Sequence, residues 1–331
     1  MKNRYPRKSH YLVLRKSKDG YRMKHVLTEE KWTMPVDEAR FIKALDGKTN
    51  PYKLGYSRAF ADSILDFMEE EELLDDGERK LDIGIGSALF TVYIPDIKLI
   101  HRFVGFLWNH LLMVMWLPIL ILGLFIAGAE KYYYIDGGLG MVLLGIYGGM
   151  AIGLIVHELS HAAAALNYGG SLLEMGVMVR LFLMMGAYCL IDYDNVRDHF
   201  KRAQISAAGP ESNLLLCGVF LCMLKLGVFP SEFLIYAGGI NCCLALLNLA
   251  LVDGLDGSAV FEKIFGCSRF VSRAFGLLFD KGAKRRLKYG GITGRATLAA
   301  CYMICTMQAL IPMVIFMQVV SIIVSVVVVL F

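Results

Sequence analysis

The last 35 residues of the chain, 297–331, contain no charged side chain. About 20 consecutive apolar residues are enough for a helix to cross the hydrocarbon core of a bilayer. Earlier apolar runs of comparable length lie at about 103–128, 139–167, 204–227 and 232–252. Because lipid offers the backbone no hydrogen-bond partner, such runs are expected to fold as helices. We therefore predict a polytopic α-helical membrane protein with about five transmembrane helices, the last one tilted or kinked at Pro312.

The first hundred residues have a different composition, because residues 1–102 hold 19 of the 34 Lys and Arg side chains. Their apolar residues alternate in some stretches and recur at helical spacing in others. The patterns predict two strands within 11–27, helices over 35–45 and 57–74, and a strand pair over 80–97. This order indicates a small α+β domain of the winged-helix type over 1–100, followed by a membrane-embedded domain over 101–331.

Basic side chains predict which ends of the helices face the cytosol. The linker 254–296 holds nine Lys or Arg residues, whereas the loops 129–138 and 228–231 together hold only Lys131. The positive-inside rule therefore places the N-terminus and the linker in the cytosol. The Gly-punctuated segment 169–192 is too short for two clean spans, so it predicts a membrane-embedded hairpin shielded by protein. We expect a multi-pass protein of a cell membrane, bacterial in origin.

One apolar run contains three ionisable side chains. The segment 153–170, GLIVHELSHAAAALNYGG, places His157, Glu158 and His161 among small and apolar residues. Histidines four apart lie on one face of a helix and can share a Zn²⁺ ion at about 2.0–2.1 Å. Glu158 then adjoins the metal without being a ligand, which suits a catalytic base acting on water. Ionisable groups in membrane spans are costly and usually functional, so this H-E-x-x-H pattern favours a zinc site over a merely structural polar cluster.

A catalytic zinc site needs a third protein ligand and an open position for water. Two candidates, Asp253 and Asp256, lie in the stretch NLALVDGLDGSAVF at the end of the fourth apolar run. Gly254 and Gly257 allow the backbone to turn there and to bring a carboxylate inward. Spacing alone does not separate the two aspartates.

Three motifs together resemble the site-2 protease family of intramembrane zinc metalloproteases. They are HELSH within an apolar run, AAGPESN at 207–213 and LDG at 255–257, and the resemblance covers about 139–265. In that family the aspartate of the LDG motif is the third zinc ligand, which implies Asp256. The other positions that the resemblance assigns to the lining of the site are Gly209, Pro210, Asn213 and Asn248. The chain departs from the family at Leu251 and Asp253, which stand where prolines are common, so the backbone before the motif can turn differently.

The N-terminal domain is similar in pattern to PqqD-like winged-helix domains, which bind the leader peptides of ribosomally made peptide products. The resemblance covers about 10–97 and rests on VDEARFIKALDGKTNPYKL, SILDFMEEEELL and the flanking strands. It implies a leader peptide as partner and peptide maturation as the process. A regulatory or packing domain without a ligand is the alternative. Nucleic acid is not expected as a partner, because the stretch EEEELLDDGE would repel phosphates.

The resemblance and the metal motif together predict a zinc metalloendopeptidase that hydrolyses a peptide bond in or near the bilayer. The substrate would be a membrane-associated protein or peptide, either a ribosomally made product or a membrane-anchored regulator. One alternative is a catalytically silent zinc-binding scaffold, or an immunity or export protein. A transporter is a further alternative, which the lack of an inverted pair of broken apolar helices disfavours.

Overall fold

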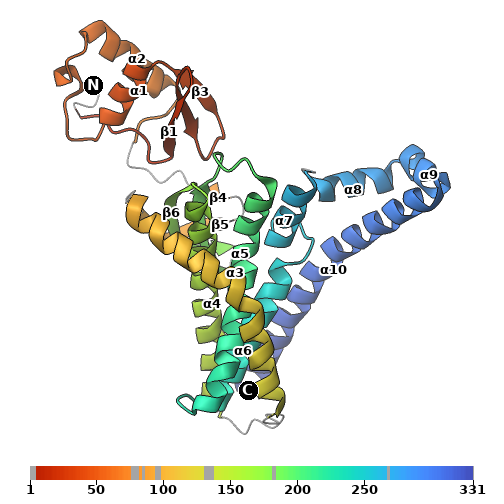
Figure 1. Ribbon diagram of the computed structural model, residues 1–331. Coiled ribbons are helices and arrows are strands. Elements are labelled where there is room, and N and C mark those ends of the chain that lie inside the picture. Colours follow the sequence, from red (N-terminus) through yellow and green to blue (C-terminus); the bar gives the residue numbers. More distant parts are fainter. Residues whose placement is uncertain are drawn as a thin grey trace. The chain divides into compact units, whose positions relative to one another are not determined.

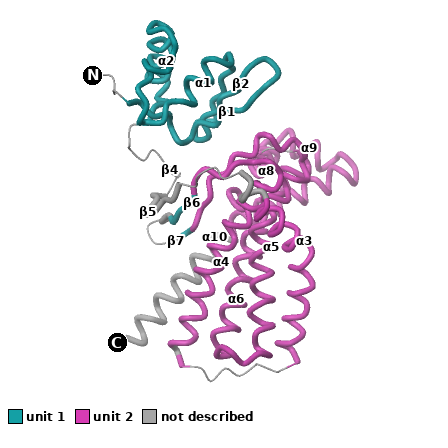
Figure 2. The backbone as a smooth tube through the Cα atoms, turned by 60° about the vertical axis from the view of Figure 1, so that its left-hand side comes forward, with its two compact units in different colours: residues 1–93, 175–186 teal, residues 94–174, 187–331 magenta. Residues whose placement is uncertain are grey.

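The computed structural model describes residues 5–75, 82–83, 86–93, 98–129, 138–180, 184–266 and 269–330. The chain divides into two compact units, Met1–Tyr93 with Met175–Gly186, and Ile94–Glu174 with Ala187–Phe331 (Figure 2). The first unit ends close to the boundary that composition indicates. It also takes in the far end of a hairpin from the second half of the chain.

A three-stranded antiparallel sheet and two helices form most of the first unit (Figure 1). The elements are β1 (Leu12–Ser17), β2 (Gly20–His25), β3 (Lys31–Met34), α1 (Val36–Ala44) and α2 (Arg58–Glu70), with a short 3-10 helix at Pro51–Lys53. The strands pair in the order β1-β2-β3. The β1–β2 turn ends at Gly20, whose φ of +132° is open to glycine and rarely adopted by other residues. These elements confirm the two strands and the two helices that the sequence predicts.

The core of this unit lies between the sheet and the two helices. Ser57 caps α2 by accepting a hydrogen bond from the Phe60 amide at 3.3 Å. The helix then buries the apolar face that its sequence spacing predicts, with Ile64, Leu65 and Met68 all buried. Each fully buried apolar side chain of this kind contributes about 1.5–3 kcal/mol relative to an exposed one.

The second sheet joins strands that are far apart in the sequence. Its order is β4 (Asp82–Ile83), β5 (Gly86–Tyr93), β6 (Ser171–Arg180) and β7 (Met184–Asp192). The sequence assigned 80–97 to the closing strand pair of a winged helix, whereas these strands pair with the β6–β7 hairpin. Alternation identifies a strand but not its partner, because pairing depends on the buried face and on turn geometry. The winged-helix assignment therefore stays a prediction that rests on the first 75 residues.

Four helices of the second unit are long and apolar enough to cross a membrane. They are α3 (Lys98–Ala129), α4 (Leu139–Asn167), α5 (His199–Met223, continued by a 3-10 turn to Leu226) and α6 (Ser231–Asn248). The candidate spans within them run Phe103–Ala129, Gly140–Asn167, His199–Leu226 and Ser231–Asn248. The predicted fifth run forms one continuous helix, α10 (Gly291–Leu330), rather than a hairpin. Much of its apolar end lies outside the residues whose side chains the structure describes, so the fifth span stays a prediction.

Helix α5 is the centre of this bundle and contacts α3, α4, α6 and α7 (Figure 1). In the most apolar stretch of α5, 61% of the residues are buried. In that of α3 only 11% are buried, because many of its large apolar side chains face outward. Glycines bring the helices close together. A Cβ atom added at Gly218 of α5 would lie 2.6 Å from the Ile119 carbonyl oxygen of α3. Small residues at such crossings allow the backbones to approach closely.

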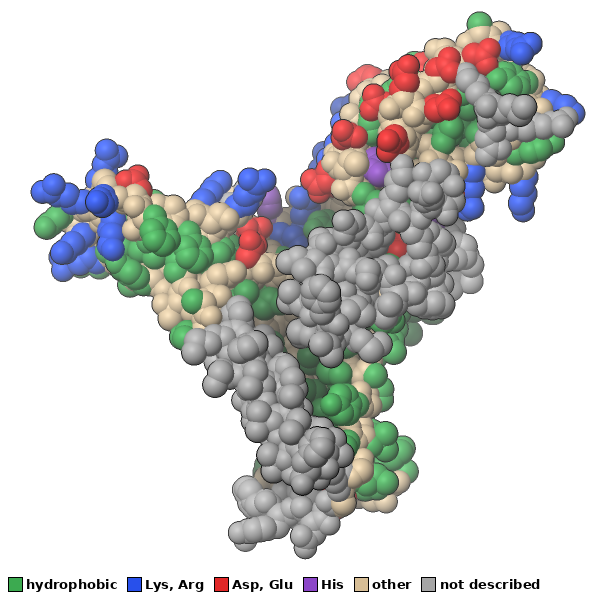
Figure 3. Space-filling view, turned by 180° about the vertical axis from the view of Figure 1, so that it is seen from behind, with side chains coloured by type: hydrophobic (Ala, Val, Ile, Leu, Met, Phe, Trp, Pro, Cys, Tyr) green, Lys and Arg blue, Asp and Glu red, His purple; other side chains and the backbone are tan. Residues whose placement is uncertain are grey.

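Three shorter helices fill the segment that composition suggested as a linker. They are α7 (Asp256–Phe265), α8 (Phe270–Phe279) and α9 (Lys281–Tyr289). Phe270, Val271 and Ala274 of α8 are buried in one cluster with Cys301 and Ile304 of α10. Lys and Arg side chains gather over α9, as Figure 3 shows.

The packing at Gly218 yields a stability prediction. We expect Gly218→Leu to lower the free energy of unfolding by at least about 1–3 kcal/mol, because the α3 and α5 backbones must separate to admit the side chain. Gly239→Leu on α6 is the matched control, since nothing lies within 4 Å of a Cβ atom there. Thermal unfolding of the two purified variants in detergent measures the difference. Equal melting temperatures would contradict the close α3–α5 crossing.

Candidate metal centre

The two histidines of the H-E-x-x-H pattern lie one turn apart on α4. Their Nε2 atoms are 3.1 Å apart, and the two residues are only 5% and 8% exposed. Helix α4 is fixed at this point by a hydrogen bond from Trp108 Nε1 of α3 to Ser160 Oγ, at 2.9 Å. The bundle therefore holds both imidazoles in an enclosed position.

Asp256, the first residue of α7, completes the group. Its Oδ2 atom lies 3.0 Å from His157 Nε2 and 3.3 Å from His161 Nε2. Burial raises the pKa of Asp256, but its hydrogen bonds to the two histidines outweigh burial and hold the pKa below its ordinary value. The carboxylate is therefore ionised, as a metal ligand must be.

The local backbone explains why Asp256 and not Asp253 reaches the histidines. Gly254 has a φ of +84°, a conformation that favours glycine, so the chain turns between the two aspartates. Gly257 is buried so closely against the Leu249 carbonyl oxygen that no side chain fits there. Asp253 is exposed, and its backbone amide donates a hydrogen bond to Gln308 Oε1 at 2.9 Å.

Each histidine also has a contact at its Nδ1 atom, on the side of the ring that faces away from the other candidate ligands. His161 Nδ1 lies 2.6 Å from the Ile205 carbonyl oxygen, which can only accept, so Nδ1 carries a proton. When Nε2 gives up the proton that hydrogen-bonds Asp256, it becomes a lone-pair donor for a metal. His157 Nδ1 lies 3.2 Å from the amide of Asn213. In this orientation the amide nitrogen of Asn213 faces the ring. The buried Oδ1 atom then has no hydrogen-bond partner among the described residues. A half-turn of the amide places Oδ1 against a protonated Nδ1, so His157 Nε2 can likewise exchange its proton for a metal.

The distances between the three candidate ligand atoms fit a zinc ion. Its three candidate ligand atoms all lie within 4.8 Å of one another. Tetrahedral zinc with bonds of about 2.0–2.1 Å would separate its ligand atoms by about 3.3–3.4 Å, close to the 3.0, 3.1 and 3.3 Å observed. Gly209 of α5 faces the histidines, and a Cβ atom there would lie 2.5 Å from His157 Nε2. The missing side chain leaves room beside two imidazole nitrogens and a carboxylate, a donor set that zinc takes in hydrolases.

The remaining residues that the sequence singled out lie at different distances from this group. Asn213 contacts His157 directly, as the family resemblance implies. Pro210 is buried within α5 next to Gly209. Asn248 is turned to its own helix, where Nδ2 donates a hydrogen bond to the Leu244 carbonyl oxygen at 3.1 Å.

Glu158 follows His157 on α4 and is partly exposed. Its carboxylate lies near the side chain of Cys189 on β7, a residue that sequence reasoning did not single out. Cys189 stands in an apolar stretch with no pattern of its own, so only the folded hairpin reveals this contact. The hairpin also buries Glu174, which accepts a hydrogen bond from the Tyr188 hydroxyl across the two strands.

Comparisons of the chain with family models, with curated proteins and with solved structures find no match.

The geometry predicts which residues a metal needs. We expect purified wild-type protein to hold about one zinc per chain, and Asp256→Ala to lose it, because two imidazoles alone form an incomplete site. Asp253→Ala is the matched control, since its side chain is exposed, and it should retain the metal. Inductively coupled plasma mass spectrometry on both variants measures the content. Loss of zinc from Asp253→Ala with retention by Asp256→Ala would contradict the assignment.

Proposed function

We propose that this chain is an intramembrane zinc metalloprotease. The observation that carries the proposal is the convergence of His157, His161 and Asp256 within 4.8 Å, with Glu158 one residue from a candidate ligand. The four candidate spans support a location in a membrane, and the Lys and Arg asymmetry supports a cytosolic N-terminus. The membrane location and the cytosolic N-terminus are both part of the proposal.

In the proposed reaction His157, His161 and Asp256 would hold a zinc ion. A bound zinc ion lowers the pKa of water and polarises a carbonyl group, which makes peptide-bond hydrolysis feasible near neutral pH. Glu158 accepts the proton of the attacking water and returns it to the leaving amine, as a general base and then a general acid. Ile205 and Asn213 hold the two imidazoles in the required tautomer and orientation.

The surroundings of the site suggest the form of the substrate. A helical peptide hides its carbonyl carbons behind hydrogen bonds, so the scissile segment must be extended or unwound. The β6–β7 hairpin carries Cys189 beside Glu158, and a strand of such a hairpin can receive an extended peptide by strand addition. A buried plug with no substrate contact is the alternative role for this hairpin. The buried Glu174–Tyr188 pair serves either role, because it holds the two strands in register.

The N-terminal unit is proposed to select the substrate. Its three-stranded sheet ends in the edge strands β1 and β3, and edge strands capture peptides by adding them to the sheet. A leader peptide of a ribosomally made product is the partner that its pattern suggests. None of the three candidate zinc ligands lies in this unit.

Substitution of Glu158 tests whether the site is catalytic. In Glu158→Gln the side chain keeps its size but cannot accept a proton, while all three candidate ligands are untouched. We expect zinc content to be unchanged and cleavage to fall by about 10²–10⁴-fold. The measurement is immunoblot of epitope-tagged single-span peptides co-expressed with the protease, using those that the wild type cleaves.

Two further variants complete this experiment. Glu69→Gln on the exposed side of α2 removes the same charge outside the site and should cleave as the wild type does. His157→Ala should lose zinc and cleavage together. Full cleavage by Glu158→Gln would remove Glu158 as the base. A zinc-binding scaffold would instead retain zinc in the wild type and cleave none of the peptides.

A further inference from the structure

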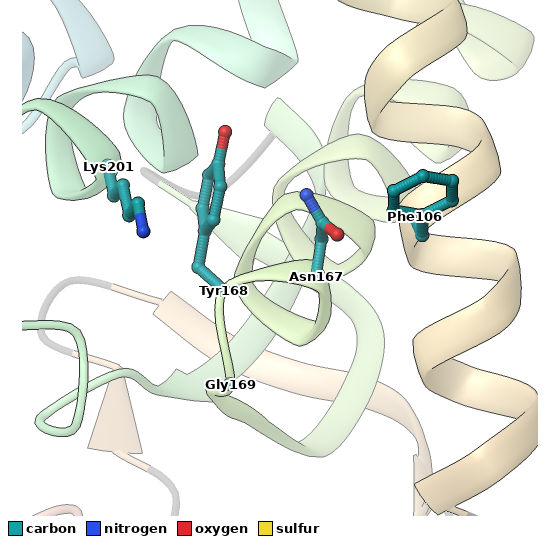
Figure 4. Close-up of a pocket in the computed structure, with 5 residues that line it drawn as sticks. All are labelled: Phe106, Asn167, Tyr168, Gly169 and Lys201. Atoms are coloured by element: carbon teal, nitrogen blue, oxygen red, sulfur yellow. The ribbon is translucent and has the colours of Figure 1, made fainter.

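A pocket lies at the end of α4, away from the metal group. It is lined by Phe106 of α3, by Asn167, Tyr168 and Gly169 at the end of α4, and by Lys201 of α5, and its volume is about 420 Å³ (Figure 4). Figure 4 shows Lys201 and Phe106 on opposite sides, with Tyr168 and Asn167 between them. All five residues belong to the second unit.

The pocket lies where three candidate spans end. Asn167 is the last residue of the α4 span, Lys201 stands in the first turn of the α5 span, and Phe106 lies near the start of the α3 span. If these helices cross a bilayer, the pocket is at the level of the lipid head groups, where a chain leaves the hydrocarbon core.

The polar side of the pocket offers donors and no acid. The ammonium of Lys201 lies 5.7 Å from the centre of the Tyr168 ring, and none of the five lining residues is Asp or Glu. Within the described residues, no ion pair engages Lys201 and no hydrogen bond engages the Asn167 side chain. A cation and an amide N–H, one on each side of Tyr168, favour an anionic ligand with several acceptor oxygens.

The wall between these groups is held rigidly. The Tyr168 hydroxyl donates a hydrogen bond to Gln204 Oε1 at 2.5 Å and accepts one from Asn109 Nδ2 at 3.2 Å. Gly169 has a φ of +88° and no heavy atom within 4 Å of an added Cβ, so the chain turns away and leaves the pocket open beside it. The Tyr168 side of the pocket is therefore held in place before a ligand arrives.

The other side of the pocket is apolar. Phe106 is 52% exposed, and its ring lies tilted against that of His110, with a centroid distance of 4.1 Å and an interplanar angle of 39°. An apolar wall opposite a cation fits a ligand with an anionic head and a hydrocarbon body. Free phosphate would use the polar wall alone, so the exposed Phe106 favours a lipid.

We propose that this pocket binds the phosphate group of an anionic glycerophospholipid, with Lys201 and Asn167 on the phosphate and Phe106 along the upper acyl chain. Binding of such a lipid would tie α3, α4 and α5 together at the end that leads into β6.

Native mass spectrometry of the full-length protein in detergent tests this site. The probes are dioleoyl phosphatidylglycerol, dioleoyl phosphatidylcholine and inorganic phosphate. We expect the wild type to retain phosphatidylglycerol in preference to phosphatidylcholine. Lys201→Gln should weaken phosphatidylglycerol binding about fivefold, the usual effect of one basic residue at an anionic lipid surface. Asn167→Leu should weaken phosphatidylglycerol binding as well. Lys201→Arg keeps the positive charge and should bind phosphatidylglycerol as the wild type does, which would exclude misfolding as the cause of the loss.

Lys281→Gln on the exposed face of α9 is the matched control and should bind as the wild type does. An equal loss in this variant would show general charge attraction and overturn the site. Displacement of the lipid by millimolar inorganic phosphate would assign the pocket to a free anion and overturn the lipid proposal. Equal retention of the two lipids by the wild type would also overturn it.

Discussion

The second unit is organised around the cost of enclosing three ionisable side chains in an apolar helix bundle. A charged or polar group removed from water must be paired or bind a metal. His157, His161 and Asp256 meet this requirement by facing one another at 3.0–3.3 Å. Helices α4 and α7 must therefore stay in register with each other, although 99 residues separate His157 from Asp256.

The rest of the bundle supports that contact through α5. This helix supplies the Ile205 carbonyl oxygen to His161, the Asn213 amide to His157 and the open space at Gly209. Because α5 also packs against α3 at Gly218, a shift of either helix would disturb the group. A site built on rigid helices in this way is positioned more precisely than one built on loops.

Much of this arrangement can be predicted from sequence because it depends on local patterns. Apolar runs predict the candidate spans, and the spacing of His157 and His161 places their imidazoles on one face. Spacing does not separate Asp253 from Asp256, because the choice depends on the turn at Gly254, which only the fold reveals. Pairing of β4 and β5 with a hairpin some eighty residues later, and the contact of Cys189 with Glu158, are likewise long-range and leave no local signal.

The most direct test of the account is X-ray absorption spectroscopy at the zinc edge on the purified wild-type protein. Zinc bound by His157, His161 and Asp256 should show a first shell of nitrogen and oxygen alone at about 2.0–2.2 Å, with outer scattering from two imidazole rings. Substitution of His161 by Ala should reduce the imidazole scattering to that of one ring or abolish metal binding. The chain contains eight cysteines. A sulfur shell at about 2.3 Å would place the zinc on thiolates and contradict the centre formed by His157, His161 and Asp256.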